Sequence, residues 1–167
     1  MGMLSLLFAV GVINPAQVAP PLCASQISVG LDTEDGAFDG MSHSGALLVV
    51  RNIGPQACRI MARPSLRFED DSGRALPIVG APPSELRAGA VVPPVAIASG
   101  ADATAPRRWV SSDAYGAGNC VSPARLVLGQ GPSRRAVKFS STLCGPAGKP
   151  ITFEQPALKT ESVYRPR

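Results

Sequence analysis

Short apolar runs separated by turn-forming residues recur along the chain, and no long amphipathic helix interrupts them. Residues 45–53 form a continuous apolar run, which is typical of a buried central strand. Residues 58–68 alternate in part, although Pro64 interrupts the alternation and predicts an edge position or a bulge. Glycine and proline around Pro132 predict a hairpin turn between two further strands. The other predicted strands cover residues 26–31, 75–79, 95–98, 104–110, 125–128, 136–140 and 151–153.

This succession of short strands predicts an all-β fold. Many short strands with turns between them are typical of an immunoglobulin-like antiparallel β-sandwich. The composition agrees, because 17 prolines and 17 glycines favour turns, and 45% hydrophobic residues suffice for a buried core. We predict that residues 23–158 form one sandwich domain and that residues 159–167 form a flexible tail.

The N-terminal segment is apolar, and the first charged side chain is Asp32. Residues 3–13 are too short to span a bilayer but match the apolar region of a secretory signal. We interpret residues 1–22 as a signal-peptide-like segment, which predicts a periplasmic or secreted protein without a transmembrane span in the mature chain. The usual basic residues at its start are missing, so a divergent signal, an upstream start and a buried first strand all stay open. A lipid anchor at Cys23 is disfavoured, because Leu22 and two prolines precede it where small residues are needed.

Four cysteines, Cys23, Cys58, Cys120 and Cys144, are spread along the chain. No two of them have the close spacing of a zinc knuckle, so a zinc site is disfavoured. Two disulfides are the better interpretation. They predict an oxidising, extracytoplasmic compartment, because disulfides persist only there in most organisms.

Strand geometry selects one of the three possible pairings of four cysteines. Cys120 and Cys144 each lie twelve residues from Pro132, so a hairpin centred on that proline would place them opposite each other. If the first three strands run down, up and down, Cys23 and Cys58 lie at the same end of the sandwich. We therefore predict one disulfide within each of these two cysteine pairs.

Charge is distributed unevenly along the chain, although the net charge is only +4. Residues 1–106 contain 6 basic and 9 acidic residues, whereas residues 107–167 contain 10 basic and 3 acidic residues. The second segment predicts a basic face for an acidic protein or an anionic envelope surface, and a merely solvated sheet face is the alternative. Only 5% of the residues are aromatic, which disfavours nucleic acid as a partner because few stacking platforms exist. The predicted partner-binding residues are Arg107, Arg108, Arg134, Arg135 and Lys138.

No set of residues in the sequence indicates a catalytic or cofactor site. His43 is the only histidine, and the serines beside it are sequence neighbours, which rarely satisfy the geometry of a catalytic triad. Residues 32–40 form an acidic loop, but Gly36 falls where a calcium-binding loop requires a ligand. No phosphate loop or dinucleotide fingerprint is present. We predict that the protein is not an enzyme and holds no metal or cofactor.

Several short motifs follow one another in a familiar order. The order is Asn52-Ile53-Gly54, then Cys58, then residues 64–68, and then the turn Asp71-Ser72-Gly73. Together with residues 97–103, this order resembles the bacterial extracytoplasmic family catalogued as domain of unknown function 4232. The resemblance covers roughly residues 23–153 and implies a secreted or envelope β-sandwich, often a lipoprotein, with no catalytic residues.

The sequence departs from that family pattern at two positions. Ser99 stands where proline is usual, and Ala62 stands where glycine is usual. These departures concern local turns rather than the fold.

We expect an exported, non-enzymatic β-sandwich that serves as a binding or structural module of the bacterial envelope. A carbohydrate-binding or cell-wall-binding protein is the alternative, for which Trp109, Tyr115 and Tyr164 are the candidate stacking aromatics. A hydrolase that uses His43 is the least favoured function.

Overall fold

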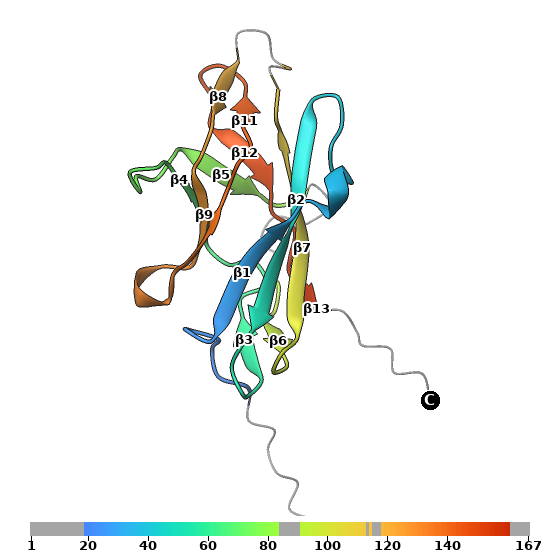
Figure 1. Cartoon of the computed structure of the whole chain (residues 1–167), viewed down its shortest axis with the longest axis vertical. Helices are drawn as coiled ribbons and strands as arrows, with labels where there is room; N and C mark the ends of the chain where they lie inside the picture. The colour runs from blue at the N-terminus through green and yellow to red at the C-terminus, as the bar shows by residue number, and fades with distance from the viewer. Residues whose placement is uncertain (1–18, 84–90, 113, 115–117, 161–167) are drawn as a thin grey trace, which may run out of the picture.

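Two facing layers of β-strands form the structure, an immunoglobulin-like antiparallel β-sandwich with two disulfides (Figure 1). It is a computed structural model that describes residues 19–83, 91–112, 114 and 118–160. One layer is a large sheet with the strand order β1-β2-β7-β11-β8, in which β12, β13 and β5 also pair, and the other is the sheet β10-β9-β4. The strands β3 and β6 form a separate ribbon. The strands are β1 Ile27–Asp32, β2 His43–Asn52, β3 Cys58–Ile60, β4 Leu66–Glu69, β5 Ile78–Ala81, β6 Val95–Ile97, β7 Asp102–Val110, β8 Asn119–Val121, β9 Arg125–Leu128, β10 Arg135–Lys138, β11 Leu143–Gly145, β12 Ile151–Glu154 and β13 Lys159–Thr160, with 3-10 turns η1 Glu34–Gly36 and η2 Gly131–Ser133.

Strand β7 organises the large sheet. It pairs with β2 along its whole length, and its other edge is shared by β13, β12 and β11 in turn. Alternate residues of β7 point inward, so Ala103, Ala105 and Trp109 are buried, whereas Pro106 and Arg108 are exposed. The outer face of the large sheet is therefore formed by the even-numbered residues of β7.

An aromatic cluster joins the two layers in the core. The Phe68 ring of β4 lies edge-on to Phe139, with 4.9 Å between ring centroids, and edge-on to Phe153 of β12 at 5.2 Å. Trp109 of β7 lies 5.2 Å from Phe139. All four rings are buried, and such edge-to-face pairs add to the stabilisation that burial itself provides.

Both predicted disulfides are present, Cys23–Cys58 and Cys120–Cys144. The first links Cys23, in the segment that precedes β1, to Cys58 at the start of β3, and both cysteines are buried. The second links neighbouring strands, since Cys120 of β8 pairs directly opposite Cys144 of β11. Two such disulfides indicate that the folded chain occupies an oxidising environment.

The hairpin that led to the second pairing is shifted by one residue from its predicted register. A turn centred on Pro132 would place Ala136 opposite Leu128, but Arg135 occupies that position. The prediction is wrong there because the loop between Leu128 and Arg135, residues 129–134, contains the turn η2 and has its centre between Gly131 and Pro132 rather than on Pro132. The register changes where the chain crosses between sheets, and it brings Cys120 opposite Cys144.

The predicted strand at residues 75–79 behaves differently from expectation. It was expected to pair with the preceding strand along its length. Its pairing with β4 consists of a bridge between Ala75 and Glu69 and a hydrogen bond from Leu76 N to Phe68 O. The chain then crosses to the large sheet, where β5 lies parallel to β12. The remaining named strand pairs are antiparallel.

The predicted terminal segments are only partly described. Residues 1–18 and 161–167, which contain most of the predicted signal and tail, lie outside the described residues. Leu22, assigned to the signal-like segment, bridges Arg59 of β3. At the other end, β13 pairs with Ala103 and Thr104, so strand structure continues two residues into the predicted tail. Among the described residues, no helix is long and apolar enough to cross a membrane.

Candidate functional site

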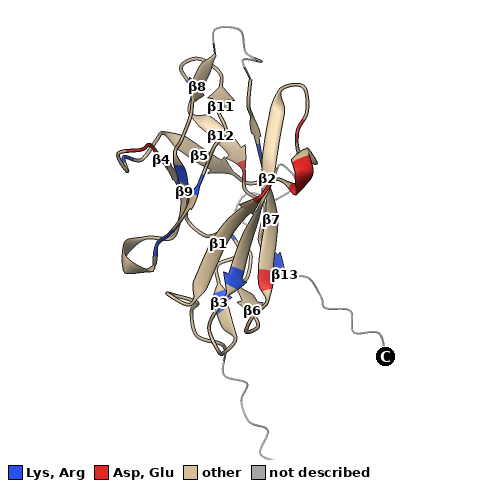
Figure 2. Cartoon of the chain, in the orientation of Figure 1, with Lys and Arg blue, Asp and Glu red and all other residues tan. Residues whose placement is uncertain are grey.

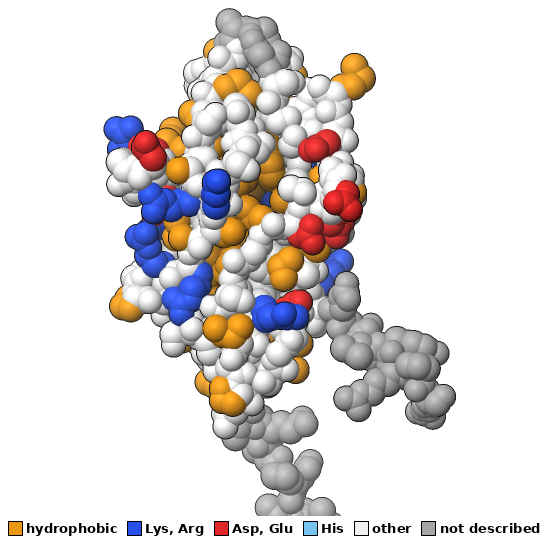
Figure 3. Space-filling model, in the orientation of Figure 1, with side chains coloured by type: hydrophobic (Ala, Val, Ile, Leu, Met, Phe, Trp, Pro, Cys, Tyr) orange, Lys and Arg blue, Asp and Glu red, His pale blue; other side chains and the backbone are white. Residues whose placement is uncertain are grey.

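The outward face of the sheet β10-β9-β4 carries a concentration of positive charge. In register, Lys138 lies opposite Arg125, and Arg67 of β4 lies on the same face one row away. Arg134, immediately before β10, lies beside them because it shares the parity of Lys138. Figures 2 and 3 show basic residues gathered over β4 and β9, on the side of the molecule away from the acidic turn η1. We call this surface the basic sheet face and define it as Arg67, Arg125, Arg134 and Lys138.

One carboxylate lies within the basic sheet face. Glu69 is only 1% exposed, and its Oε1 accepts a 2.8 Å hydrogen bond from Arg67 Nε. Its Oε2 lies 3.6 Å from Arg134 Nη2 and accepts no hydrogen bond. Arg125 instead donates to Asp71 O at 2.8 Å, and Lys138 forms no hydrogen bond or ion pair with the described residues. Arg67 and Arg134 therefore contact the Glu69 carboxylate, and Asp71 lines a hollow beside Arg125 and Lys138, so four basic residues outnumber two acidic ones on this surface.

Arg107, predicted to lie on the basic face, does not lie on the surface. Its side chain is 2% exposed and points into the core from β7, opposite Ala46. Its Nη1 donates to Pro156 O at 2.9 Å and to Pro106 O at 3.2 Å, while Nε and Nη2 have no hydrogen-bond partner. Burial lowers the pKa of Arg107 to about 10.

The other four predicted residues lie in three different places. Arg134 and Lys138 belong to the basic sheet face, whereas Arg135 points to the opposite side of β10. Arg135 donates to Ile27 O at 3.0 Å and to Ser25 O at 2.6 Å, so it ties β10 to the beginning of β1. Arg108 is exposed on the outer face of the large sheet. The structure thus brings together two of the five predicted residues.

Arg67 and Arg125 are members of the basic sheet face that the sequence reasoning missed. Arg67 lies in residues 1–106, where acidic residues outnumber basic ones, so the uneven distribution of charge along the chain did not indicate it. The alternation of residues 66–69, with Phe68 buried, was the available signal that Arg67 faces outward.

A second surface feature is an open groove of about 550 Å³ on the outer face of the large sheet. We call it the outer groove. Its floor comes from β2, β7, β12 and β5, and residues 37–40 of the β1–β2 connection form one wall. The charged or titratable residues that line it are Asp39, His43, Arg108 and Glu154.

His43, the candidate for hydrolysis, lies in the outer groove. Its ring Nδ1 is 3.0 Å from the Ser42 Oγ, and both groups belong to an exposed contact between sequence neighbours. No carboxylate is hydrogen-bonded to this ring among the residues that the structure describes. Within the described residues, the serine–histidine pair therefore lacks the third group that orients the histidine in a triad.

The acidic β1–β2 connection forms a tight turn with its own backbone. Asp32 Oδ1 accepts a 2.8 Å hydrogen bond from Glu34 N, and Glu34, Asp35 and Gly36 all have positive φ. Within the described part of the chain, no group of three or more His, Cys, Asp or Glu residues is arranged to hold a metal ion.

Of the three candidate sugar-stacking aromatics, the structure describes Trp109, which is buried. Trp109 is 5% exposed, and its Nε1 donates to Ser141 Oγ at 3.1 Å. Tyr115 and Tyr164 lie outside the described residues.

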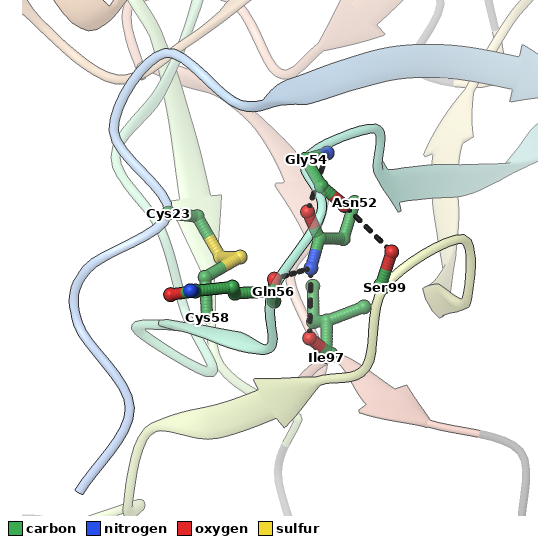
Figure 4. Close-up of a disulfide and its surroundings, with 7 residues drawn as sticks. All are labelled: Cys23, Asn52, Gly54, Gln56, Cys58, Ile97 and Ser99. Atoms are coloured by element: carbon green, nitrogen blue, oxygen red, sulfur yellow. Dashed lines mark hydrogen bonds between the residues drawn. A yellow bond between two sulfur atoms is a disulfide. The ribbon is translucent and has the colours of Figure 1, made fainter.

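The motif Asn52-Ile53-Gly54 takes part in a hydrogen-bond network beside the Cys23–Cys58 disulfide (Figure 4). Asn52 Nδ2 donates to Gln56 O at 2.8 Å and to Ile97 O at 3.0 Å, and its Oδ1 accepts from Gly54 N at 2.9 Å. Ser99, which follows β6, completes this network, because its Oγ donates to Gly54 O at 2.7 Å. The Asn52-Ile53-Gly54 motif is therefore structural, because its amide joins the end of β2 to the neighbouring ribbon.

A comparison with protein families confirms the resemblance found in the order of the sequence motifs. The family described as Domain of unknown function (DUF4232) matches residues 23–158. No curated protein and no solved structure was found to be similar. The chain belongs to the DUF4232 family.

Proposed function

We propose that this protein is an exported, non-enzymatic binding module of the cell envelope that holds an anionic partner against its basic sheet face. The main supporting observation is the excess of positive charge there, because the four basic residues Arg67, Arg125, Arg134 and Lys138 outnumber the acidic residues Glu69 and Asp71 beside them. Such a surface attracts acidic partners and raises their association rate. The partner is an acidic protein or an anionic envelope surface.

Two observations support a location in the periplasm or outside the cell. The disulfides Cys23–Cys58 and Cys120–Cys144 are stable in an oxidising compartment. The apolar residues 3–13 match the apolar region of a secretory signal. Mass spectrometry of the mature N-terminus tests export, because cleavage before Cys23 is expected and a retained Met1 would contradict it.

A non-enzymatic role is consistent with the surroundings of His43. Its exposed ring is hydrogen-bonded to the adjacent Ser42, and this contact gives no means to orient the histidine toward a substrate. A panel of ester and peptide substrates is therefore expected to show no turnover that His43→Ala abolishes.

Charge reversal tests the basic sheet face. We expect Arg134→Glu/Lys138→Glu to weaken capture of the envelope partner at least about tenfold at low salt, because two attractive contacts become repulsive. The matched control is Lys149→Glu/Lys159→Glu, which makes the same change of net charge at exposed positions away from this face. Capture that survives high salt, or that falls equally in both variants, would exclude the basic sheet face as the binding surface.

A further inference from the structure

The floor of the outer groove places charged groups of three neighbouring strands on one surface. His43 of β2 pairs with Val110 and Gly45 pairs with Arg108, so His43 and Arg108 lie one row apart on the same face. Phe153 of β12 pairs with Trp109, which places Glu154 beside Arg108 across the next strand boundary. The sheet register therefore fixes where these groups stand.

The wall of the outer groove is anchored by Phe38. This side chain packs on Gly45, where an added Cβ would lie 2.7 Å from Phe38 Cβ and 2.6 Å from Arg107 O. Only glycine leaves room for the wall to approach the sheet so closely. The position of the wall is thus determined by the backbone of β2.

Arg108 is held in place but keeps its hydrogen-bonding capacity. Its guanidinium lies 5.6 Å from the centroid of the Phe38 ring, a cation–π contact that orients it. It donates no hydrogen bond and forms no ion pair within the described ranges 19–83, 91–112, 114 and 118–160. A planar guanidinium with free donors is well suited to bind a carboxylate through two parallel hydrogen bonds.

Two carboxylates in the outer groove are also free. The side chains of Asp39 and Glu154 accept no hydrogen bond and form no ion pair with any described residue. Both residues are exposed, so their oxygen atoms are accessible to a ligand. The groove therefore offers one cation for a carboxylate and two anions for an ammonium group.

We propose that the outer groove binds a short peptide whose two termini are free. Arg108 would take the terminal carboxylate, while Asp39 and Glu154 would take the terminal ammonium. The volume of about 550 Å³ falls within the range of small-molecule sites. This site lies on the large sheet and is separate from the basic sheet face, so either proposal can fail without the other.

Isothermal titration calorimetry provides the measurement. Trp109 is a poor fluorescence reporter of the outer groove, because its side chain is buried on the inward face of β7. The probe is alanyl-alanine in four forms: free, N-acetylated, C-amidated and blocked at both ends. We expect the free form to bind best and each blocked terminus to weaken binding roughly fivefold, because one charge-assisted contact is lost.

Variants assign each terminus to its partner. In Arg108→Gln the preference for a free carboxylate should disappear while the preference for a free ammonium remains, and Asp39→Asn/Glu154→Gln should show the reverse. Lys159→Gln, an exposed change on β13, is the control and should bind like the unaltered protein. Equal binding of all four probes, no binding at millimolar peptide, or an unchanged carboxylate preference in Arg108→Gln would overturn the proposal.

Discussion

At Asn52, one buried side chain satisfies three backbone groups. The residue is fully buried. Its side-chain amide donates hydrogen bonds to Gln56 O and Ile97 O and accepts one from Gly54 N. Removing the amide leaves the two buried groups, Ile97 O and Gly54 N, without this partner, and each such loss costs about 1–3 kcal/mol. The carbonyl of the exposed Gln56 can bond water instead. The side chain therefore contributes more to stability than its size would indicate.

We predict that Asn52→Ala lowers the free energy of unfolding by about 2–4 kcal/mol, as measured by chemical denaturation. Ser99→Ala removes a single hydrogen bond, to Gly54 O, and should cost only about 1 kcal/mol. An Asn52→Ala variant as stable as Ser99→Ala would show that the stability of this region does not depend on the Asn52 amide.

Asp70, in the turn after β4, makes a pH-dependent contribution to the stability of the folded protein. Hydrogen bonds from the Ser72 hydroxyl at 2.6 Å and from Arg74 N at 2.9 Å lower the pKa of Asp70 below its usual value of 3.8. A carboxylate with a lowered pKa stabilises the folded state above its unfolded pKa, and this stabilisation is lost as the pH falls through the folded value.

The stability difference between the unaltered protein and Asp70→Asn should therefore be present at neutral pH and disappear in acid below pH 3.8. Denaturation at a series of pH values measures it. Ser72→Ala, which removes the hydroxyl donor but keeps the Asp70 carboxylate, should make this difference smaller. A difference that grows in acid would contradict the assigned hydrogen bonds.

At the scale of elements, strand alternation explains which parts of the site could be predicted. Arg107 and Arg108 are adjacent in β7, and Arg134 precedes Arg135 of β10 in extended backbone, so each pair must point to opposite faces. A single basic face containing all five predicted residues was therefore impossible once these segments were strands. The sequence alone could not show which member of each pair faces inward, because that depends on packing against the other layer.

The predicted strands succeeded where apolar residues form runs, and β8 and β11 were missed. Residues 45–53 and 125–128 correspond closely to β2 and β9. The three-residue strands β8 and β11 carry no such pattern, and they exist because neighbouring strands and the Cys120–Cys144 disulfide hold them in the large sheet. The parallel contact of β5 is likewise a tertiary effect that no local pattern indicates.

The two disulfides differ in exposure, and this difference predicts the order of their reduction. Cys23 and Cys58 are 2% and 0% exposed, whereas Cys120 is exposed at the edge strand β8. A thiolate reductant must reach a sulfur atom, so the Cys120–Cys144 disulfide should be reduced first in the folded protein.

Differential alkylation followed by mass spectrometry measures that order. Label should appear at Cys120 and Cys144 before Cys23 and Cys58, and the partly reduced protein should lose about 2–4 kcal/mol of stability. In denaturant all four cysteines should be labelled together. Earlier labelling of Cys23 in the folded protein would show that the segment before β1 opens more readily than the edge of the large sheet.

At the scale of the whole molecule, the two layers are joined by the aromatic core and by one polar clamp. Arg135 reaches from β10 to the carbonyl groups of Ser25 and Ile27, at the beginning of the first strand of the other layer. This clamp connects segments more than one hundred residues apart in sequence, with separations of 108 and 110. Such a contact forms only when both layers are in place.

We predict that Arg135→Met lowers the free energy of unfolding by about 1–3 kcal/mol, because the apolar stem is retained while both charge-assisted hydrogen bonds are lost. Lys138→Met, on the same strand, removes an equal charge that has no partner among the described residues and should change stability by less than about 0.5 kcal/mol. Hydrogen exchange locates the effect. Faster exchange in both β1 and β10 of Arg135→Met would identify the clamp as a joint between layers, whereas faster exchange confined to β10 would show that the aromatic core alone holds them together.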